Sequence, residues 1–464
     1  MLALLFVLLQ TDARAPRPPR PPNIVHVLAD DVAWDDFSCY GSHDLVTPNI
    51  DRIASEGMRF TDFYAPSSTC TPSRAAILTG CYAQRVGLPQ VLFPNSEVGL
   101  AEGEVTIAEL LKGRGYATAL VGKWHLGHLP QFLPTRHGFD LFFGLPYPND
   151  HGPERLTAKE PRVSRGFPAI PLLRGESVVE QPAQLASLPE RFVAEARRFI
   201  AEHKDGPFYL QLSNIETHTP WFVPQRFQYK SRSGVYGDAV ACLDWSVGEL
   251  LDELARQGLD GDTLVVVSAD NGPLVHRYPE LEGIYGHAAT VDPERRHRLR
   301  EGKYQGRYEG GTRVACVARW PGHVAPGGVS SELVAGFDLF TTFARLAGAE
   351  VPADRIVDGH DLSPLLLGRS ADFQRRDTLF HYENFELVAV RHGNWKLVLP
   401  RKPGEQPELY DLAADASETT DQAQEQADIV ERLLALCERA REDLGDSKQR
   451  VEGLNRRPAG KLVR

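Results

Sequence analysis

The chain contains four short apolar runs, and each ends abruptly in polar residues. The runs are rich in Val, Ile and Leu, which is typical of strands buried on both faces in a parallel sheet. They are Asn23 to Ala29 before Asp30-Asp31, Tyr116 to Gly122 before Lys123-Trp124-His125, Pro207 to Ser213 before Glu216-Thr217-His218, and Thr263 to Ala269 before Asp270-Asn271. The pattern therefore predicts buried strands that are followed by polar side chains.

Segments with a helical period lie between these runs. Apolar residues recur at helical spacing in Ile107 to Leu111, Phe192 to Ile200 and Val240 to Leu254. Strands that alternate with helices indicate an α/β fold with a mostly parallel sheet flanked by helices. In such a sheet, ligands bind outside the carboxyl ends of the strands, so the polar residues that end the four runs should converge on one edge.

The pattern changes past about residue 370, so we expect a large α/β domain over 23–370 and a small α+β domain over 371–445. Short strands are expected at Leu387 to Arg391 and Trp395 to Leu399, around a His-Gly-Asn turn, and an amphipathic helix near Ile429 to Glu442. The basic tail, 446–464, has no periodic pattern and is expected to be loose.

The first residues have the pattern of a targeting segment. Met1 to Leu9 is apolar, and Ala13-Arg14-Ala15 has the small-x-small form of a cleavage site. The run is too short to span a bilayer, and residues 1–15 are therefore interpreted as a signal peptide for export to the periplasm or the medium. A basic region before the run is missing, so a misplaced start codon is the alternative. Residues 16–22 are Pro-rich and form an extended lead-in.

Composition excludes several classes of protein. The chain has 464 residues with 24% charged and 42% hydrophobic residues, which is ordinary for a folded protein and unlike a disordered or polytopic membrane protein. Lys and Arg number 51 against 62 Asp and Glu, a net charge of −11, so nucleic acid is not an expected partner. Six cysteines without a C-x-x-C pair argue against a zinc site or a disulfide scaffold.

One cysteine lies in a chemically unusual segment. In Cys70-Thr71-Pro72-Ser73-Arg74, Pro and Ser favour the start of a helix, and Ala75 to Leu78 continue it. Cys70 would then lie at a helix amino terminus, where the dipole and free N–H groups favour an anion. Arg74, one turn along, can add a bidentate donor. A buried thiol before an ordinary helix is the alternative on this segment alone.

The Cys-x-Pro-Ser-Arg segment followed by Ala-Ala-Ile-Leu-Thr-Gly closely resembles the type I sulfatases, in which it directs conversion of the cysteine to formylglycine. The similarity extends from about residue 23 to Leu412 and is nearest to the arylsulfatase A and N-acetylgalactosamine-6-sulfatase branches. Further blocks in family order are Asp30-Asp31, Thr47-Pro48-Asn49, Gly122-Lys123-Trp124-His125, Ala269-Asp270-Asn271-Gly272 and Tyr308-Glu309-Gly310-Gly311-Thr312-Arg313. The resemblance implies an alkaline-phosphatase-like fold with a large mixed, mostly parallel sheet.

Four residues at two strand ends offer oxygen ligands: Asp30, Asp31, Asp270 and Asn271. Hard divalent cations prefer this ligand set, and a cage made of protein oxygens suits Ca²⁺ better than Mg²⁺, although the spacing leaves Mg²⁺ open. The resemblance implies calcium and adds the modified Cys70 as a further ligand.

A sulfatase needs cations around the sulfuryl oxygens and a proton donor beside the bridging oxygen. Lys123, Lys303 and Arg74 can supply positive charge. The resemblance implies roles for both lysines and for two histidines, with His125 beside the formylglycine and His218 near the leaving group. It also implies that hydrated formylglycine attacks sulfur with one hydroxyl and releases sulfate with the help of the other.

The expected partners are a sulfated small molecule or glycan and a maturase that generates formylglycine. Two other functions stay open: a phosphonate monoester or phosphodiester hydrolase of the same superfamily, and an inactive glycan-binding relative. One position departs from the family pattern, since Pro148 stands where arylsulfatase A relatives carry a sulfate-contacting serine. Asn149 and His151 are the candidates to replace that contact.

Overall fold

A computed structural model describes residues 21–155, 163–164, 166–275 and 297–462 of the chain. Its centre is a ten-stranded mixed sheet in the order β10-β9-β6-β5-β11-β1-β12-β13-β2-β14. The strands are β1 Asn23–Ala29, β2 Met58–Phe60, β5 Ala117–Lys123, β6 Leu141–Leu145, β9 Leu172–Arg174, β10 Ser177–Glu180, β11 Phe208–Ser213, β12 Thr263–Ala269, β13 Cys316–Arg319 and β14 Gly328–Ser330. The predicted fold class is confirmed.

The middle of the sheet is parallel. Strands β6, β5, β11, β1 and β12 run in the same direction, so their carboxyl ends share one edge. Every residue of β1 and β12 is buried, which explains why these segments are almost continuously apolar. The four predicted strands are confirmed, two of them shifted by one residue.

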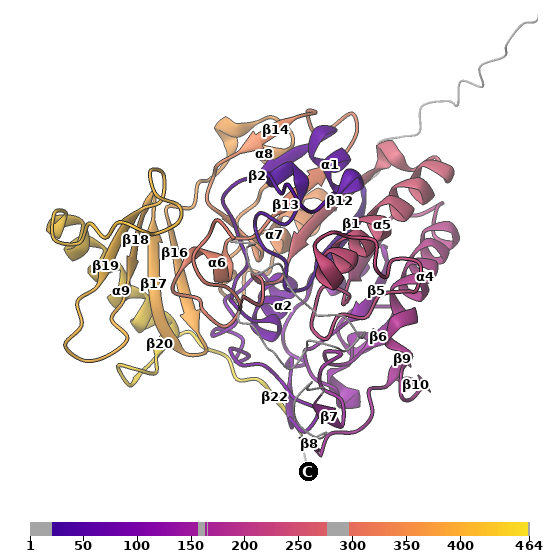
Figure 1. The fold of residues 1–464 in the computed structure, drawn as a ribbon, viewed down its shortest axis with the longest axis horizontal. Coiled ribbons are helices and arrows are strands. Elements are labelled where there is room, and N and C mark those ends of the chain that lie inside the picture. Colours follow the sequence, from indigo (N-terminus) through magenta and orange to yellow (C-terminus); the bar gives the residue numbers. More distant parts are fainter. Residues whose placement is uncertain (1–20, 156–162, 165, 276–296, 463–464) are drawn as a thin grey trace, which may run out of the picture.

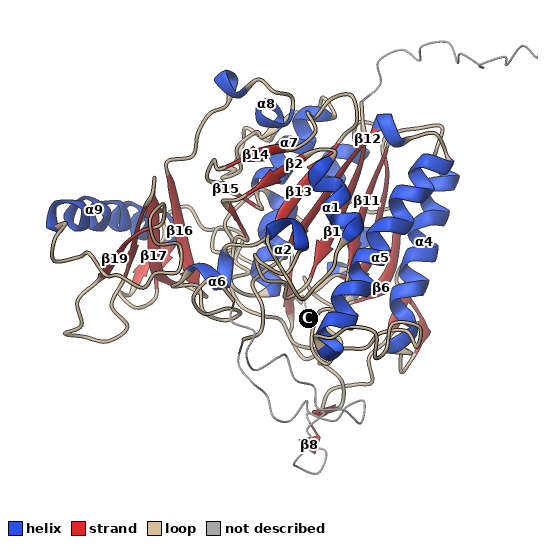
Figure 2. Cartoon of the chain, turned by 45° about the horizontal axis from the view of Figure 1, so that its top comes forward, coloured by secondary structure: helices blue, strands red, loops and turns tan. Residues whose placement is uncertain are grey.

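Helices cover the sheet. Figure 2 shows α1, α4 and α5 lying across one face, and α5 contacts both α1 and α4. A second group in mutual contact consists of α2, α3 and α7. The helices are α1 Pro48–Ser55, α2 Cys70–Thr79, α3 Ile107–Lys112, α4 Leu188–Glu202, α5 Gly234–Arg256, α6 Glu309–Thr312, α7 Asp338–Leu346 and α8 Ser363–Leu366.

A separate four-stranded antiparallel sheet lies beside the main body (Figure 1). Its strands are β16 Thr378–Glu383, β17 Glu386–His392, β18 Trp395–Val398 and β19 Glu408–Asp411, and helix α9 Ala427–Leu444 packs against it. The predicted hairpin around His392-Gly393-Asn394 is present, with His392 opposite Trp395. Short strand pairs complete the fold: β3 Phe63–Tyr64 with β15 Val334–Ala335, β7 Glu154–Arg155 with β8 Val163–Ser164, and β20 Gly445–Asp446 with β21 Val451–Glu452.

The basic tail is not loose, so that prediction is wrong. Its strand β22, Gly460–Lys461, pairs with β4, Val98–Gly99, of the main body. Arg457 lies on the same return path and donates to the buried carboxylate of Glu104 at 2.6 Å. The tail is held because its basic side chains and backbone have partners hundreds of residues earlier in the chain.

The predicted signal peptide, residues 1–15, lies outside the described residues, as does most of the lead-in. Among the described residues, none of the helices combines the length and the apolar character that crossing a bilayer requires. All six cysteines are free thiols, which agrees with the absence of a disulfide scaffold.

Candidate active site

The ends of two neighbouring strands bring the predicted oxygen ligands together. Asp30 and Asp31 follow β1, Asp270 and Asn271 follow β12, and the last residues of the two strands are in register. The backbone N–H of Asp270 donates to the carbonyl of Ala29 at 3.0 Å, which continues the parallel pairing beyond the strand ends. All four side chains are buried.

These residues fit a divalent cation. The amide nitrogen of Asn271 donates to Asp31 Oδ1 at 2.8 Å, and this bond fixes the orientation of the amide. Asn271 Oδ1 is buried and has no hydrogen-bond partner among the described residues. Burial, together with the carboxylates of Asp30 and Asp270, raises the pKa of Asp31 to about 7 against the lowering effect of Lys303. An unpaired carbonyl oxygen beside crowded carboxylates is the donor set that a hard cation needs.

Two buried lysines lie against the carboxylates. Lys123, the last residue of β5, places Nζ 2.6 Å from Asp30 Oδ2. Lys303 places Nζ 2.7 Å from Asp31. Although burial would raise the pKa of Asp30, Lys123 and its other cationic neighbours hold that pKa well below its usual range. Each ammonium has three donors, so each has further donors for an anionic ligand.

Cys70 is the first residue of α2, as predicted, and Thr69 precedes it in an extended conformation. Its Sγ lies 3.5 Å from Asp30 Oδ1. One ligand atom from each of Cys70, Asp30, Asp31 and His218 lies within 4.8 Å of the others. Burial raises the pKa of the Cys70 thiol to about 12, with a further contribution from Asp30, so the unmodified side chain stays protonated at neutral pH.

Arg74 lies one turn into α2, as predicted, and its guanidinium bonds to protein oxygens. Its guanidinium donates to Asp270 Oδ2 at 2.9 Å, to Asp30 Oδ2 at 3.3 Å and to the carbonyl of Lys123 at 2.9 Å. The side chain is 1% exposed. Arg74 therefore holds the carboxylates and the end of β5 in place, and its donors point to protein oxygens.

His125 lies two residues beyond β5, in the left-handed backbone region with φ of 66°. Thr71 of α2 donates its hydroxyl to the carbonyl of His125 at 3.1 Å, which ties the histidine to the start of the Cys70 helix. His125 Nε2 lies 2.9 Å from the carbonyl of Leu92. A carbonyl only accepts, so Nε2 carries the hydrogen and Nδ1 keeps its lone pair. Nδ1 is buried without a partner among the described residues.

His218 follows β11, the strand next to β1, and lies beside the Asp31 carboxylate. Its Nδ1 lies 2.6 Å from the carbonyl of Thr219, so Nδ1 donates and Nε2 is turned toward Asp31, 3.8 Å from Oδ2. Burial lowers the pKa of His218 to about 3, and the ammonium groups of Lys303 and Lys123 add to this effect. The imidazole is therefore neutral at neutral pH in this state.

The segment that carries Lys303, residues 300–308 and here named the lysine loop, is held by the second sheet. Its attachments are Arg300 Nη1 to the Glu418 carbonyl at 3.1 Å, Gly306 N to Glu383 at 2.8 Å, and Arg307 to the Leu399 carbonyl and to Glu386, both at 2.7 Å. A side chain at Gly302 could not fit, because its Cβ would lie 2.3 Å from the carbonyl of Pro273. The approach of Lys303 to Asp31 thus depends on residues from the carboxyl-terminal part of the chain.

Asn149 and His151 are the candidates to replace the sulfate contact that is missing at Pro148, and they differ in the contacts that they already make. Asn149 uses its amide nitrogen on the carbonyls of Pro220, at 2.9 Å, and His218, at 3.4 Å. Only its oxygen is left, and an oxygen acceptor does not bind a sulfate oxygen. His151 is buried, and its ring contacts the ring of His125 edge to face at 5.7 Å. Of the two, His151 keeps the geometry for such a contact.

Asp150 was not singled out from the sequence. It belongs to the segment after β6, a fifth parallel strand whose carboxyl end lies on the same edge of the sheet. Although burial would raise it, the pKa of Asp150 is lowered by His218, His151 and Lys303, so Asp150 lies in the electric field of the site. The rule used for the other strand ends would have found Asp150 if Leu141–Leu145 had been predicted as a strand.

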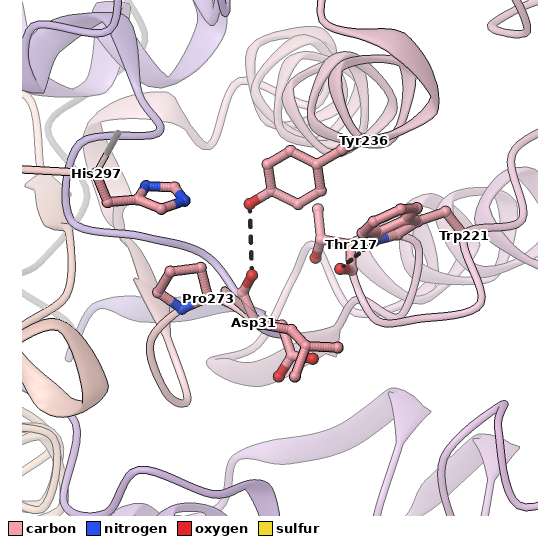
Figure 3. Close-up of a pocket in the computed structure, with 7 residues that line it drawn as sticks. Asp31, Thr217, Trp221, Tyr236, Pro273 and His297 are labelled. Atoms are coloured by element: carbon pink, nitrogen blue, oxygen red, sulfur yellow. Dashed lines mark hydrogen bonds between the residues drawn. The ribbon is translucent and has the colours of Figure 1, made fainter. Parts of the chain in front are cut away.

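A small cavity of about 10 Å³ lies behind the carboxylates, bordered by Asp31, Thr217 and Tyr236. Figure 3 shows the Tyr236 hydroxyl directed at Asp31, 3.4 Å from its backbone carbonyl, and the same hydroxyl makes a much shorter hydrogen bond to the carboxylate of Asp36. Asp31 has φ of 59°, in the left-handed region. A hydroxyl has a single proton, and the closer carboxylate of Asp36 accepts it, so Tyr236 lies beside the unusual turn at Asp31 without anchoring it.

Comparison with known proteins places this geometry in a family. The family model described as Sulfatase matches residues 22–349, and the model described as N-sulphoglucosamine sulphohydrolase, C-terminal, matches residues 302–443. The chain is 44% identical over 394 residues to arylsulfatase A of Homo sapiens, covering 81% of the chain and 74% of the relative. It is 38% identical over 418 residues to N-acetylgalactosamine-6-sulfatase of Rattus norvegicus, covering 85% and 74%.

A solved structure described under the metabolism of multiple glycosaminoglycans by Bacteroides thetaiotaomicron is similar over nearly its whole length. It is 30% identical, with a TM-score of 0.76, and the match covers 91% of this chain and 99% of that one. Sequence and fold therefore agree on the relatives of the chain.

Proposed function

The chain belongs to the sulfatase family and is a sulfuric ester hydrolase, and we propose that it cleaves carbohydrate or aryl sulfates at the site around Cys70. The observation that carries the proposal is the position of Cys70 at the first turn of α2, with Sγ 3.5 Å from Asp30 Oδ1 and two lysines on the adjoining carboxylates. This arrangement combines a nucleophile position, a cation site and positive charge for a sulfate group.

Two groups would complete the site. A divalent cation, Ca²⁺ or alternatively Mg²⁺, would be held by Asp30, Asp31, Asp270, Asn271 and the modified side chain at position 70, and would supply positive charge that lowers the pKa of a bound hydroxyl. Formylglycine made from Cys70 by a maturase would supply, in its hydrated form, the two hydroxyls that attack and release require. The orphaned Asn271 Oδ1 supports the first group, and the Cys-x-Pro-Ser-Arg segment supports the second.

The residues of the chain then have separate tasks. Lys123 and Lys303 bind the sulfuryl oxygens with the donors that their carboxylates leave free, and they offset the charge that develops on sulfate. Arg74 keeps Asp30 and Asp270 in position. In this proposal Arg74 is a positioning residue, unlike the oxyanion donor that its sequence position suggested.

The two histidines divide the proton transfers. His125 offers the lone pair of Nδ1 and accepts a proton from a hydroxyl at position 70. His218 offers Nε2, beside Asp31, and donates a proton to the leaving oxygen when its imidazole is protonated. Support comes from the two backbone carbonyls, Leu92 and Thr219, which set the tautomers so that the opposite ring nitrogen is available.

The remaining expectations extend this proposal. Residues 1–15 would export the chain, residues 23–370 would form the catalytic domain, and residues 371–445 would form the second domain, whose sheet begins at Thr378. The partners would be the sulfated substrate and the maturase.

The experiment compares an aryl sulfate with an aryl phosphodiester on purified protein in which position 70 is modified. Faster turnover of the sulfate, in kcat/KM, is the expected result. Preference for the phosphodiester would replace the proposal with a phosphodiester or phosphonate monoester hydrolase. Binding of Ca²⁺ without turnover of any ester would indicate an inactive glycan-binding relative.

A further inference from the structure

A second cavity, of about 380 Å³, adjoins the proposed site. Its lining residues are Val91, Phe93, Asp150, His151, Phe167 and Tyr304. Two of them lie directly beside proposed sulfate-binding and proton-transfer residues. Lys303 Nζ lies 5.6 Å from the centroid of the Tyr304 ring, and the His151 ring lies 5.7 Å from the His125 ring. The cavity is therefore where the part of a substrate beyond its sulfate group would lie.

One wall of the cavity is a stack of rings. Phe93 stacks on His151 with centroids 4.9 Å apart and on Phe167 with centroids 6.2 Å apart. Phe93 is nevertheless 43% exposed, and Tyr304 is 52% exposed with φ of 71°, a backbone conformation that a bulky residue rarely adopts. Aromatic faces kept open to solvent beside a site are typical of surfaces that a flat ligand ring covers.

The polar part of the cavity is acidic. Asp150 supplies a carboxylate, and none of the described residues that line the cavity is Lys or Arg. A carboxylate accepts hydrogen bonds from hydroxyl groups and repels a second anion. The lysines next to this cavity, Lys123 and Lys303, are already paired with Asp30 and Asp31 at the proposed sulfate position.

We propose that this cavity binds one sugar ring of a monosulfated substrate, stacked on Phe93 and hydrogen-bonded through ring hydroxyls to Asp150. The inference rests on the proposed function and restricts the class of sulfate esters that the enzyme would accept. A volume of about 380 Å³ lies at the lower end of the range for small-ligand pockets. A steroid or a simple aryl leaving group has no hydroxyl groups that could donate hydrogen bonds to Asp150. A sugar with a second acidic group would be repelled by the negative charge of Asp150. The substrate class is thus a sulfated neutral sugar.

The test uses a matched pair of substrates, N-acetylglucosamine 6-sulfate and glucosamine 2-N,6-O-disulfate, and the same pair in the galacto series. The members of each pair share the ester and differ in one negative charge. We expect the modified enzyme to prefer the monosulfated member by roughly fivefold or more in kcat/KM, because two like charges a few ångströms apart repel each other. Asp150→Asn should reduce that preference several-fold. The ratio within one variant cancels any general effect of the substitution on catalysis.

A second variant tests the ring wall. Phe93→Ala should raise KM for the monosulfated sugar by roughly threefold to tenfold, as expected for the loss of one stacking contact, with a much smaller change in kcat. Val329→Ala, at an exposed position on the β14 edge of the sheet, is the control for a general effect of removing an apolar side chain.

The outcomes separate the two levels of the proposal. A preference for the disulfated sugar, an unchanged ratio in Asp150→Asn, or an unchanged KM in Phe93→Ala would overturn the cavity inference. Turnover of 4-nitrophenyl sulfate without turnover of any monosulfated sugar would also overturn it while leaving the sulfatase proposal intact. If no sulfate ester is hydrolysed, including 4-nitrophenyl sulfate, the proposed function itself fails.

Discussion

The ammonium of Lys396 lies 2.9 Å from the carboxylate of Glu309, and both side chains are completely buried. Lys396 belongs to β18 of the second sheet, and Glu309 begins α6 directly after the lysine loop. Glu418 joins the pair, since its carboxylate lies 3.0 Å from Lys396 and accepts the backbone N–H of Glu309 at 2.7 Å. This buried cluster couples the folding of the second sheet to the position of Lys303.

Removing the ammonium should therefore destabilise the protein. Lys396→Met removes the cation that two buried carboxylates share and leaves Glu309 paired with Arg313 alone among the described residues, and we expect a loss of about 3–5 kcal/mol in the free energy of unfolding, measured by urea denaturation. Lys402→Met, at an exposed position of the same sheet domain, is the matched control. Equal stability of the two variants would show that the cluster does not hold the domains together.

The same cluster predicts a dependence of stability on pH. Burial, together with the neighbouring Glu309 carboxylate, raises the pKa of Glu418 from 4.5 to about 7 against the lowering effect of Lys396. The folded state then binds a proton that the unfolded state has lost, so this contribution is fully present below pH 4.5 and disappears as the pH rises through about 7. The unfolding free energy of wild type minus that of Glu418→Gln should fall by on the order of 1 kcal/mol per pH unit within that window. A difference that does not change with pH would contradict the prediction.

Conversion of Cys70 is tested by mass analysis of the peptide that contains Thr71 to Arg74. We expect the mass of formylglycine at position 70 in active protein from its native host, because a protonated thiol lacks the hydroxyls that the proposed chemistry needs. Cys70→Ala should abolish sulfatase activity, whereas Cys39→Ala, at a half-buried thiol outside the site, should keep it. Active protein in which every Cys70 is an unmodified thiol would rule the assignment out.

Asn271 should contribute directly to cation binding. Its Oδ1 is buried without a protein partner among the described residues, so Asn271→Ala removes a ligand without breaking a hydrogen bond at that atom. We expect at least about a tenfold loss of Ca²⁺ affinity, measured by calorimetry, and Asn455→Ala at an exposed amide is the control. An unchanged affinity for Ca²⁺ and for Mg²⁺ would exclude Asn271 from the ligand set.

His218 and His125 should differ in their dependence on the leaving group. A sugar alkoxide needs a proton in order to depart, and an activated phenolate does not. His218→Ala should therefore lower the turnover rate of a sugar sulfate by roughly 10²- to 10⁴-fold and that of 4-nitrophenyl sulfate far less. His125→Ala should slow the turnover of both substrates. The pKa of His218 is lowered to about 3, so the protonated form declines as the pH rises, and the ratio of sugar to aryl turnover should decline with it. Equal losses on both substrates for His218→Ala would leave that residue a sulfate-binding group.

Local patterns in the sequence were sufficient for the framework of the site. Asp30 and Asp270 were predictable as neighbours because two apolar runs end immediately before them, and parallel strands in a sheet end at one edge. The helix at Cys70 was predictable from Pro72 and Ser73, whose effect on a helix start is local. These features depend on residues that are adjacent in the chain.

Other features depended on partners that are distant in the chain. The sequence placed Arg74 one turn into a helix, but only the tertiary structure brings its donors to Asp270 and Asp30. Phe93 lies outside helices and strands, so no period distinguishes it until it stacks on His151. The tail was predicted to be loose because neither Gly99 nor Glu104 can be recognised in the sequence as its partner.

The difference between the features that the sequence predicted and those that it did not has a physical cause. Hydrophobic period, helix capping and strand ends express free energies that act over a few residues, so they can be recognised in any short window of sequence. The pairing of Lys396 with Glu309 and the stacking in the sugar cavity join segments brought together by burial, and many surface residues have the same local pattern without such partners. The sequence by itself therefore determined the strands, the helix at Cys70 and the family. The tertiary structure decided which charges are paired and which aromatic faces stay open.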